Sequence, residues 1–164
     1  MGDSYTEQLV KQKTSTKTML KKFGLIVALV VSILLVFVVP FLAILPVIAI
    51  VVIGFFWKRW SCLEYEYIYY NGEIDIDRIM GMESRKRVFS TSAKDMEVLA
   101  PTGSIELQPF QNLKVFDYSS NSGNATYELV AKAKDQNVRV IFEPNDTILQ
   151  GMKYYAPRKV FLTK

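Results

Sequence analysis

The pattern of apolar and polar residues divides the chain into three parts. From Phe23 to Trp57 the residues are almost all apolar, and none of these 35 residues is charged. From Ser61 onward, apolar and polar residues alternate with a period of two, which is typical of β-strands. After Pro144, apolar residues recur at helical spacing. The pattern therefore predicts an α+β chain, with apolar helices first, then strands and a C-terminal helix.

The apolar stretch is too long for one ordinary membrane crossing. As one straight helix it would be about 52 Å long, whereas the hydrocarbon core of a bilayer is about 30 Å thick. Pro40 lies near its middle and Pro46 follows, and proline breaks helices because it lacks a backbone donor. We therefore predict a transmembrane helical hairpin with two helices, at about 23–39 and 41–57.

Basic residues flank the apolar stretch on both sides, as expected for segments that stay in the cytoplasm. Both flanks can remain there only if the chain crosses the membrane and returns. We therefore predict a multi-pass protein of the cell membrane, with both termini and the C-terminal domain in the cytoplasm. The expected anchors at the membrane interface are Lys21, Lys22, Trp57, Lys58, Arg59 and Trp60.

Three other interpretations of the apolar stretch remain open. It could form a single long span that is tilted or kinked at proline, since prolines do occur inside transmembrane helices. It could be the core helix of a soluble protein, although so small a chain could hardly cover it on all sides. A cleaved signal peptide would have a shorter apolar region of about 7–15 residues.

Charge and composition narrow the classes of function. The 164 residues carry a formal charge of +4, with one cysteine and no histidine. Residues 1–22 contain five lysines against two acids, so we expect a cytoplasmic, partly disordered basic arm. This charge lies beside the membrane and favours anionic headgroups over nucleic acid as its partner. The lack of histidine removes the commonest general base and metal ligand.

The alternating region predicts one small domain, at 61–164. The dipeptide Asn71-Gly72 is a strong signal for a tight hairpin turn. The helix should begin at Asn145 or Asp146, which are good N-caps, and end near Ala156. The predicted strands, about seven and all antiparallel, cover 61–70, 73–80, 85–91, 96–100, 113–118, 126–134 and 138–143.

This order of elements resembles the pleckstrin-homology-like (PH-like) fold, in which two antiparallel sheets form a sandwich or barrel closed by a C-terminal helix. The chain is also similar to a family of uncharacterised membrane proteins of Gram-positive bacteria, which carry an N-terminal helical hairpin and a bacterial PH-like domain. The resemblance covers most of the chain and implies architecture without an established activity. The matching stretches are Glu64-Tyr65-Glu66-Tyr67 through Asp77, Arg85-Lys86-Arg87-Val88-Phe89-Ser90, Leu99-Ala100-Pro101-Thr102-Gly103-Ser104, Phe142-Glu143-Pro144-Asn145 and Ala156-Pro157-Arg158-Lys159-Val160-Phe161.

One departure from lipid-binding PH domains affects the expected ligand. Those domains bind headgroups chiefly through a basic loop between their first two strands. Here the first two predicted strands are joined by the tight Asn71-Gly72 turn, and acidic residues follow it. The resemblance therefore predicts that the usual headgroup site is missing.

The clearest candidate contacts are basic. Arg85, Lys86 and Arg87 form the densest local cluster, and Arg158 and Lys159 form a second one in the C-terminal tail. We expect these five residues to contact anionic lipid or a protein partner, or else to balance neighbouring acids. The alternating acids Glu73, Asp75 and Asp77 could gather a divalent cation, but they lack the Ca²⁺ loop pattern, and a solvated strand face is the favoured interpretation.

No catalytic, nucleotide-binding or metal-binding motif is present in the sequence. We therefore expect no cofactor, no metal and no nucleic-acid partner. The leading hypothesis is a non-enzymatic PH-like binding or scaffolding module at the cytoplasmic membrane surface, with an unidentified protein partner. The alternative is a small structural or accessory subunit of a membrane complex, such as a transporter or secretion assembly, that uses the hairpin for interaction. An enzyme is the third hypothesis.

Overall fold

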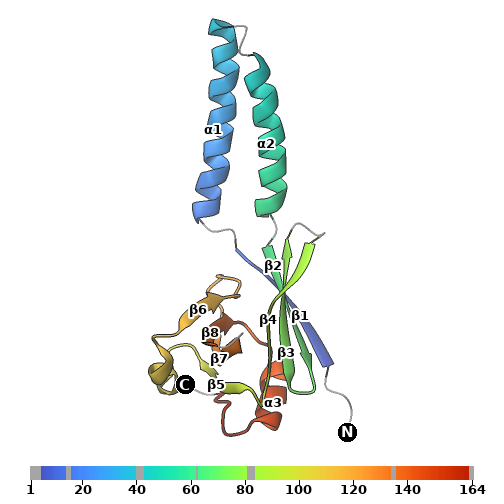
Figure 1. Ribbon diagram of the computed structural model, residues 1–164, viewed down its shortest axis with the longest axis vertical. Coiled ribbons are helices and arrows are strands. Elements are labelled where there is room, and N and C mark those ends of the chain that lie inside the picture. The colour runs from blue at the N-terminus through green and yellow to red at the C-terminus, as the bar shows by residue number, and fades with distance from the viewer. Residues whose placement is uncertain are drawn as a thin grey trace.

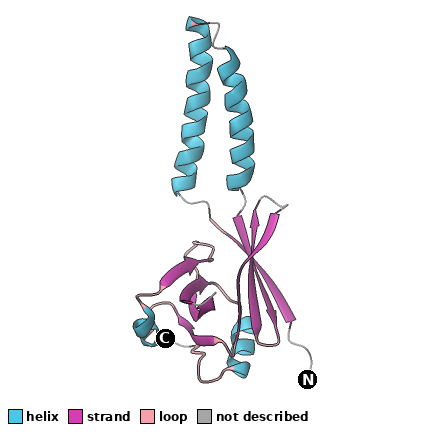
Figure 2. Cartoon of the chain, in the orientation of Figure 1, coloured by secondary structure: helices cyan, strands magenta, loops and turns pink. Residues whose placement is uncertain are grey.

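Two apolar helices rise from one end of a domain built from two β-sheets (Figures 1 and 2). The computed structural model describes residues 5–13, 16–39, 43–61, 63–80, 84–133 and 136–162. The predicted α+β class is confirmed, because a helix also closes the C-terminal end of the two sheets.

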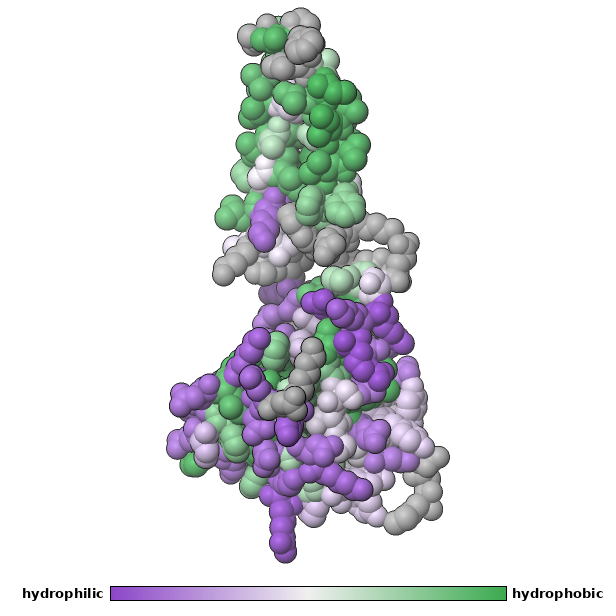
Figure 3. Space-filling model, viewed as in Figure 1, coloured by the Kyte–Doolittle hydropathy of each residue, from purple (hydrophilic) through white to green (hydrophobic). Residues whose placement is uncertain are grey.

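The two helices are α1 (Thr16–Val38) and α2 (Ile44–Ser61), and they lie side by side. The predicted break near Pro40 falls outside the described residues. Helix α1 begins within the predicted basic arm, and α2 continues past the predicted end at residue 57. Most of their side chains are apolar and exposed, so the helices form a hydrophobic column above a polar domain (Figure 3). Within the pair, Ser32 is buried and its hydroxyl donates to the Leu29 carbonyl at 2.7 Å.

The first sheet contains a strand that the sequence analysis did not predict. Its order is β1 (Tyr5–Lys11), β2 (Leu63–Tyr70), β3 (Glu73–Met80) and β4 (Ser84–Ser92), all antiparallel. The prediction that residues 1–22 form a separate, partly disordered arm is therefore wrong for residues 5–11. The predicted start of the domain at residue 61 is also wrong, because the first edge strand precedes the helices.

Side-chain alternation explains why this polar segment forms a strand. Val10 points inward and is 7% exposed beside its partner Tyr65, whereas Leu9 on the other face is 52% exposed. Gln8 also points inward. Its Nε2 donates to the Glu143 carbonyl and its Oε1 accepts from the Asn145 backbone amide, both at 2.7 Å. Strand β1 is thus tied to the segment that precedes the C-terminal helix.

The two helices are an insertion between neighbouring strands. Strand β1 leads into α1, α2 leads back into β2, and β1 and β2 pair along their whole length. Lys11, at the end of β1, is the register partner of Glu64, and their charged groups are 3.4 Å apart. The chain must therefore return to the place where it left the sheet.

The second sheet has the order β5 (Met96–Pro101), β7 (Tyr127–Ala133), β8 (Gln136–Phe142) and β6 (Lys114–Asp117). Strand β6 runs parallel to β8, so the prediction that all strands are antiparallel is wrong at this edge. The parallel pair is possible because β6 is joined to β8 by a long crossover that includes β7, rather than by a hairpin. The short 3₁₀ helix Ile105–Phe110 (η2) lies between the predicted strands 96–100 and 113–118.

The predicted Asn71-Gly72 turn is confirmed. Both residues have positive φ angles, 46° and 90°, as a type I′ turn requires. The turn lies against the C-terminal helix, because an added Cβ at Gly72 would stand 2.8 Å from the ring of Tyr155. The backbone amide of Gly72 donates to the Tyr69 hydroxyl at 3.1 Å. Both turn type and packing therefore favour glycine here.

Helix α3 (Asp146–Tyr155) closes the space between the sheets. It begins as predicted, with the side chain of Asn145 accepting from the Ile148 amide at 2.9 Å. Its apolar face is buried against both sheets. The residues that carry most of the core are Tyr67, Tyr69, Ile74, Ile76, Met96, Leu99, Leu129, Val140, Phe142, Ile148 and Met152.

Candidate functional site

A cleft of about 750 Å³ opens between the two sheets of the domain. One wall is β4, at Arg87–Ser90, and the other is formed by β6 and the paired strands β7 and β8. Both β4 and β6 are edge strands of their sheets. Such a hollow between packed layers is a common form of binding site.

The lining of the cleft combines apolar and basic side chains. Aromatic and aliphatic groups supply the apolar part: Val88, Phe89, Phe116, Tyr118 and Val138. Three residues supply positive charge: Arg87, Lys114 and Lys132. No acidic residue is among the described lining residues. The amino group of Lys114 lies 4.9 Å from the ring centroid of Phe116, an arrangement that keeps the charge beside the apolar surface.

The predicted basic cluster on β4 is largely neutralised by acids of neighbouring strands. Arg87 contacts Asp75 at 2.8 Å and Asp77 at 3.1 Å. The hydrogen bond to Asp77 raises the pKa of Arg87. Arg85 contacts Glu66 and, at 3.9 Å, Asp77. The arginines are about half exposed, whereas Glu66 and Asp77 are buried, and these pairs remove free charge from the predicted patch.

The other three predicted contacts are spread over the domain. Lys86 alternates with Arg85 and Arg87 and pairs in register with Arg78 of β3. Arg158 is exposed in the turn after α3. The amino group of Lys159 donates to the carbonyls of Lys94 and Met96, at 3.0 and 2.6 Å. The structure therefore does not gather the five predicted residues into one surface.

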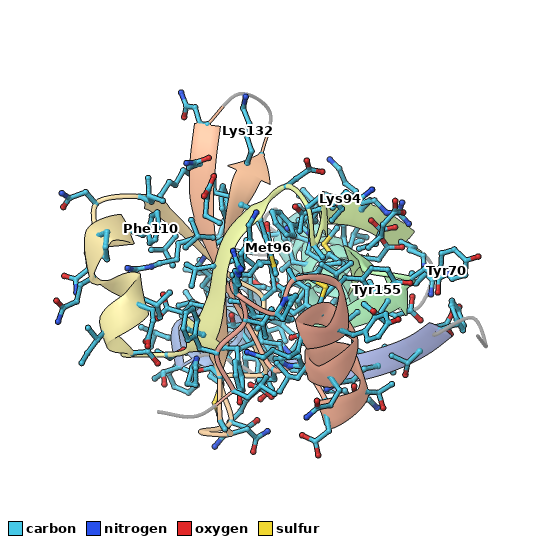
Figure 4. The ribbon with its side chains drawn as sticks, turned by 90° about the horizontal axis from the view of Figure 1, so that it is seen from below. Tyr70, Lys94, Met96, Phe110, Lys132 and Tyr155 are labelled. Carbon is cyan, nitrogen blue, oxygen red and sulfur yellow. The ribbon has the colours of Figure 1, made fainter. Side chains whose placement is uncertain are left out.

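Sequence reasoning missed Lys114 and Lys132. They lie on different strands, 18 positions apart in the chain, and only the parallel pairing of β6 with β8 puts both on the cleft. Figure 4 places Lys132 at the end of β7, on a different side of the domain from Tyr70 and Tyr155. Each lysine is isolated in the sequence, so no local charge cluster could have identified them.

Arg78 is a second feature that local sequence did not indicate. It points inward from β3, and its Nε is buried without a hydrogen-bond partner among the described residues. Burial raises the pKa of the Tyr65 and Tyr118 hydroxyls, and the positive charge of Arg78 opposes this rise. The rings of these two tyrosines lie 5.3 Å apart. A guanidinium therefore lies near two neutral hydroxyls, of which that of Tyr118 belongs to a residue lining the cleft.

A smaller polar hollow of about 300 Å³ lies on the other face of the second sheet, beneath η2. Its charged members are Glu128 and Arg139, whose side chains are 2.9 Å apart. Glu128 is 5% exposed. Because the two charges compensate each other, this hollow offers no excess charge to a ligand.

The acidic residues of β3 do not form a metal site. Asp75 and Asp77 bind arginines of β4, as described above. Within the described ranges, no group of three His, Cys, Asp or Glu residues is arranged to hold a metal ion. The predicted interface anchors Lys21, Lys22 and Trp57 lie where the helices meet the domain, and the Lys22 amino group is 4.9 Å from the Trp57 ring centroid. The side chains of Lys58, Arg59 and Trp60 are outside the described set.

Two four-stranded sheets, closed by a C-terminal helix and open at a cleft between edge strands, define a PH-like domain. The chain belongs to the family described as "Bacterial PH-like domain (DUF6106)", whose model matches residues 2–162. The match includes β1 and both helices and is not limited to the part after residue 60. No curated protein and no solved structure matches the chain.

The structure corrects the comparison with lipid-binding PH domains. Because β1 precedes the helices, the turn at Asn71-Gly72 joins the second and third strands of the sheet. The connection between the first two strands is residues 12–62, which contain α1 and α2. The position of the usual headgroup loop is therefore occupied by the helices rather than shortened to a tight turn.

Proposed function

We propose that this protein is a non-enzymatic binding or scaffolding module that α1 and α2 hold at the cytoplasmic face of the cell membrane. The observation that carries the proposal is the pairing of β1 with β2 at the base of two helices whose apolar side chains are exposed. The strand pairing requires both helix bases to lie on one side of a membrane, which two crossings satisfy and one crossing does not.

The exposure of the helices supports the membrane part of this proposal. Phe37 is 83% exposed and Val51 is 67% exposed, a state that is costly in water and natural in lipid. By length and composition, one described helical segment, Thr18–Phe37, could span a membrane. The apolar stretch Ile44–Trp57 of α2 is shorter. In the sequence Phe41 and Leu42 extend that second apolar stretch.

The distribution of charge supports a cytoplasmic domain. The sequence places Lys21, Lys22, Lys58 and Arg59 at the domain end of the two helices, and none is found at their far end. Positive residues concentrate on the cytoplasmic side of membrane proteins. The contact between Lys22 and the Trp57 ring fits an interfacial position, where tryptophan and lysine are both favoured.

Cysteine labelling tests the topology directly. In a Cys62→Ser background, one cysteine replaces Ala43 at the far end of the helices and another replaces the exposed Lys94 of the domain. A membrane-impermeant maleimide applied to intact cells should label only the Ala43→Cys variant, and Lys94→Cys should react only after permeabilisation. External labelling of Lys94→Cys, or no labelling of Ala43→Cys, would contradict the proposal.

Contact of the domain with anionic lipid is one version of the binding role. Of the five predicted contacts, Lys86 and Arg158 have no ion pair among the described residues, whereas Arg85 and Arg87 are compensated. In anionic nanodiscs, Lys86→Gln with Arg158→Gln should weaken the salt-sensitive docking of the domain onto the lipid surface, read as increased hydrogen exchange. Unchanged exchange would exclude this version.

A structural or accessory role in a membrane complex is the second candidate. Gly24 and Gly54 lie on faces where an added Cβ would meet nothing within 4 Å, so neither is used for contact between α1 and α2. Small residues on free helix faces allow close approach of another helix. Gly24→Leu with Gly54→Leu should then remove co-purifying membrane proteins in mild detergent, whereas Val27→Leu should not.

A further inference from the structure

The walls of the cleft include the edge strands β4 and β6, and β4 also approaches β7 of the other sheet without pairing with it. In the part of the chain that the structure describes, β4 pairs only with β3 and β6 pairs only with β8. The backbone of β4 from Arg85 to Ser90 makes no hydrogen bond outside its own sheet within the described residues. An exposed edge of this kind is a template for an added strand.

The charges around the cleft select for an acidic occupant. Lys114 and Lys132 lie opposite β4 and have no ion-pair partner among the described residues. Arg87 on β4 is held from its other side by Asp75 and Asp77, so it adds only a compensated charge. The excess charge of the cleft is therefore positive and lies on the wall that faces β4.

The apolar part of the cleft requires more than charge from its occupant. Phe116 and Tyr118 stack at 6.2 Å between ring centroids and lie beside Val138 and Phe89. A strand laid along β4 would direct alternate side chains toward opposite faces. Only the side chains that point toward the second sheet would meet these rings and the amino group of Lys114, which lies over the Phe116 ring.

We propose that the cleft binds an extended, acidic segment of a partner protein, which adds as a strand along β4 between Arg87 and Ser90. The segment combines apolar residues, which cover the rings, with acidic residues, which meet the lysines of the cleft. This inference rests on the proposed binding role of the domain, but it does not depend on which side of the membrane the domain lies. A free backbone edge favours a polypeptide over a lipid headgroup, because only a polypeptide can pair with it along its length.

Selection from random peptides tests the chemistry without presupposing a sequence. The full chain in mild detergent is used to select eight-residue peptides displayed on phage, at about 0.15 M salt. The expected winners are extended peptides that combine acidic with apolar residues. Failure to enrich any peptide, or enrichment of basic or uncharged ones, would overturn the proposal.

Charge reversal then tests the location. Binding of a selected, fluorescein-labelled peptide is measured by anisotropy. Lys114→Glu with Lys132→Glu should weaken it by about tenfold or more, whereas Lys94→Glu, a matched change of an exposed lysine outside the cleft, should have little effect. Bound peptide should also slow hydrogen exchange in residues 86–90. Equal effects of both changes, or protection elsewhere, would reject the cleft as the site.

Other occupants give distinct results. If the two reversals abolish binding to phosphatidylglycerol vesicles while no peptide binds, the occupant is a lipid and the proposal fails. If they abolish concentration-dependent self-association seen by light scattering, a second copy fills the cleft and the proposal also fails. Loss of peptide binding with intact labelling at Ala43→Cys would leave the membrane-anchored role standing, so failure of the two proposals can be told apart.

Discussion

The helix pair and the two-sheet domain distribute apolar side chains in opposite ways. Ile76 of β3 is 0% exposed, whereas Ile50 of α2 is 60% exposed. In the helices the small polar residue Ser32 is inside and the large apolar residues are outside. The domain buries its apolar residues because water surrounds it. The helices expose theirs, which is stable only if a different medium or partner surrounds them.

The largest expected effect comes from one truncation made in both regions. Ile76→Ala should lower the free energy of unfolding of the domain by about 2–5 kcal/mol, because it leaves a cavity in a closed core. Ile50→Ala should change it by less than about 0.5 kcal/mol. Denaturation in detergent, followed by hydrogen exchange of β2 and β3, measures both. A similar cost at the two positions would contradict the comparison.

A charge placed in helix α1 tests whether its exposed apolar side chains are in contact with lipid. Leu34 is 60% exposed on α1. Leu34→Arg should disfavour membrane insertion by about 2.5–3.5 kcal/mol, while the unfolding of the domain stays unchanged. Insertion into microsomes with carbonate extraction provides the measurement, and Leu34→Ala is the control. Full insertion of the arginine variant would count against lipid contact at this face.

Gly151 tests how tightly α3 packs in the domain. An added Cβ would stand 2.7 Å from Cε1 of Tyr69 and closer to its hydroxyl. Gly151→Ala should therefore lower stability by about 1–3 kcal/mol, although alanine favours helix by about 1 kcal/mol. Gln150→Ala, at an exposed position of the same helix, should be neutral. Adding Tyr69→Phe should restore part of the loss. A net gain from Gly151→Ala would refute the tight contact.

Alkaline pH should produce a smaller effect, confined to the domain. Burial raises the pKa of Tyr67, whose hydroxyl donates to the Tyr118 carbonyl at 2.6 Å. The neutral phenol is favoured in the folded state, so this stability is fully present below the unfolded pKa near 10 and is lost as pH rises above it. Tyr67→Phe should cost about 1 kcal/mol at pH 7 and weaken the loss of stability between pH 10 and 11.

An exposed tyrosine provides the control for this titration. Tyr154 is 66% exposed, so Tyr154→Phe should leave both the stability at pH 7 and its alkaline dependence unchanged. Chemical denaturation at a series of pH values measures all three proteins. An equally steep loss in the Tyr67→Phe variant would assign the pH dependence to other groups.

Local sequence was sufficient to predict the elements whose partners lie close to them in the chain. Strand β3 has the predicted bounds, and β2 differs from its prediction only at its start. The Asn71-Gly72 turn sets their register because only a few backbone conformations close a two-residue loop. Helix α3 was predicted from its N-cap at Asn145 and its helical spacing for the same reason, since these signals act within a few residues.

Strand β1 could not be predicted in this way. Its partner β2 lies beyond both helices, with Gln8 opposite Tyr67. Only Val10 among its inward residues is apolar, and the lysines around it suggested a solvated arm. Its position is fixed by backbone pairing and by the two hydrogen bonds of Gln8, which depend on segments distant in sequence.

The candidate site also combined features that the local sequence showed with features that only the folded structure showed. The densest basic run, Arg85-Lys86-Arg87, was evident in the sequence, as was the alternative that it balances neighbouring acids, but the particular pairs with Glu66, Asp75 and Asp77 depend on the folded sheet. The open charge belongs to Lys114 and Lys132, which the β6–β8 pairing brings to one cleft. Charge density along the chain therefore did not indicate where uncompensated charge lies in space.

By itself, the sequence determined the apolar helices, the β2–β3 hairpin and the C-terminal helix, because periodicity, turn chemistry and capping are local. Only the tertiary structure decided that the helices are inserted within a sheet and that two edge strands enclose a basic cleft. Those features depend on pairings between segments many residues apart. Such pairings are selected by the burial and hydrogen bonding of the whole domain, and no short stretch of sequence contains that information.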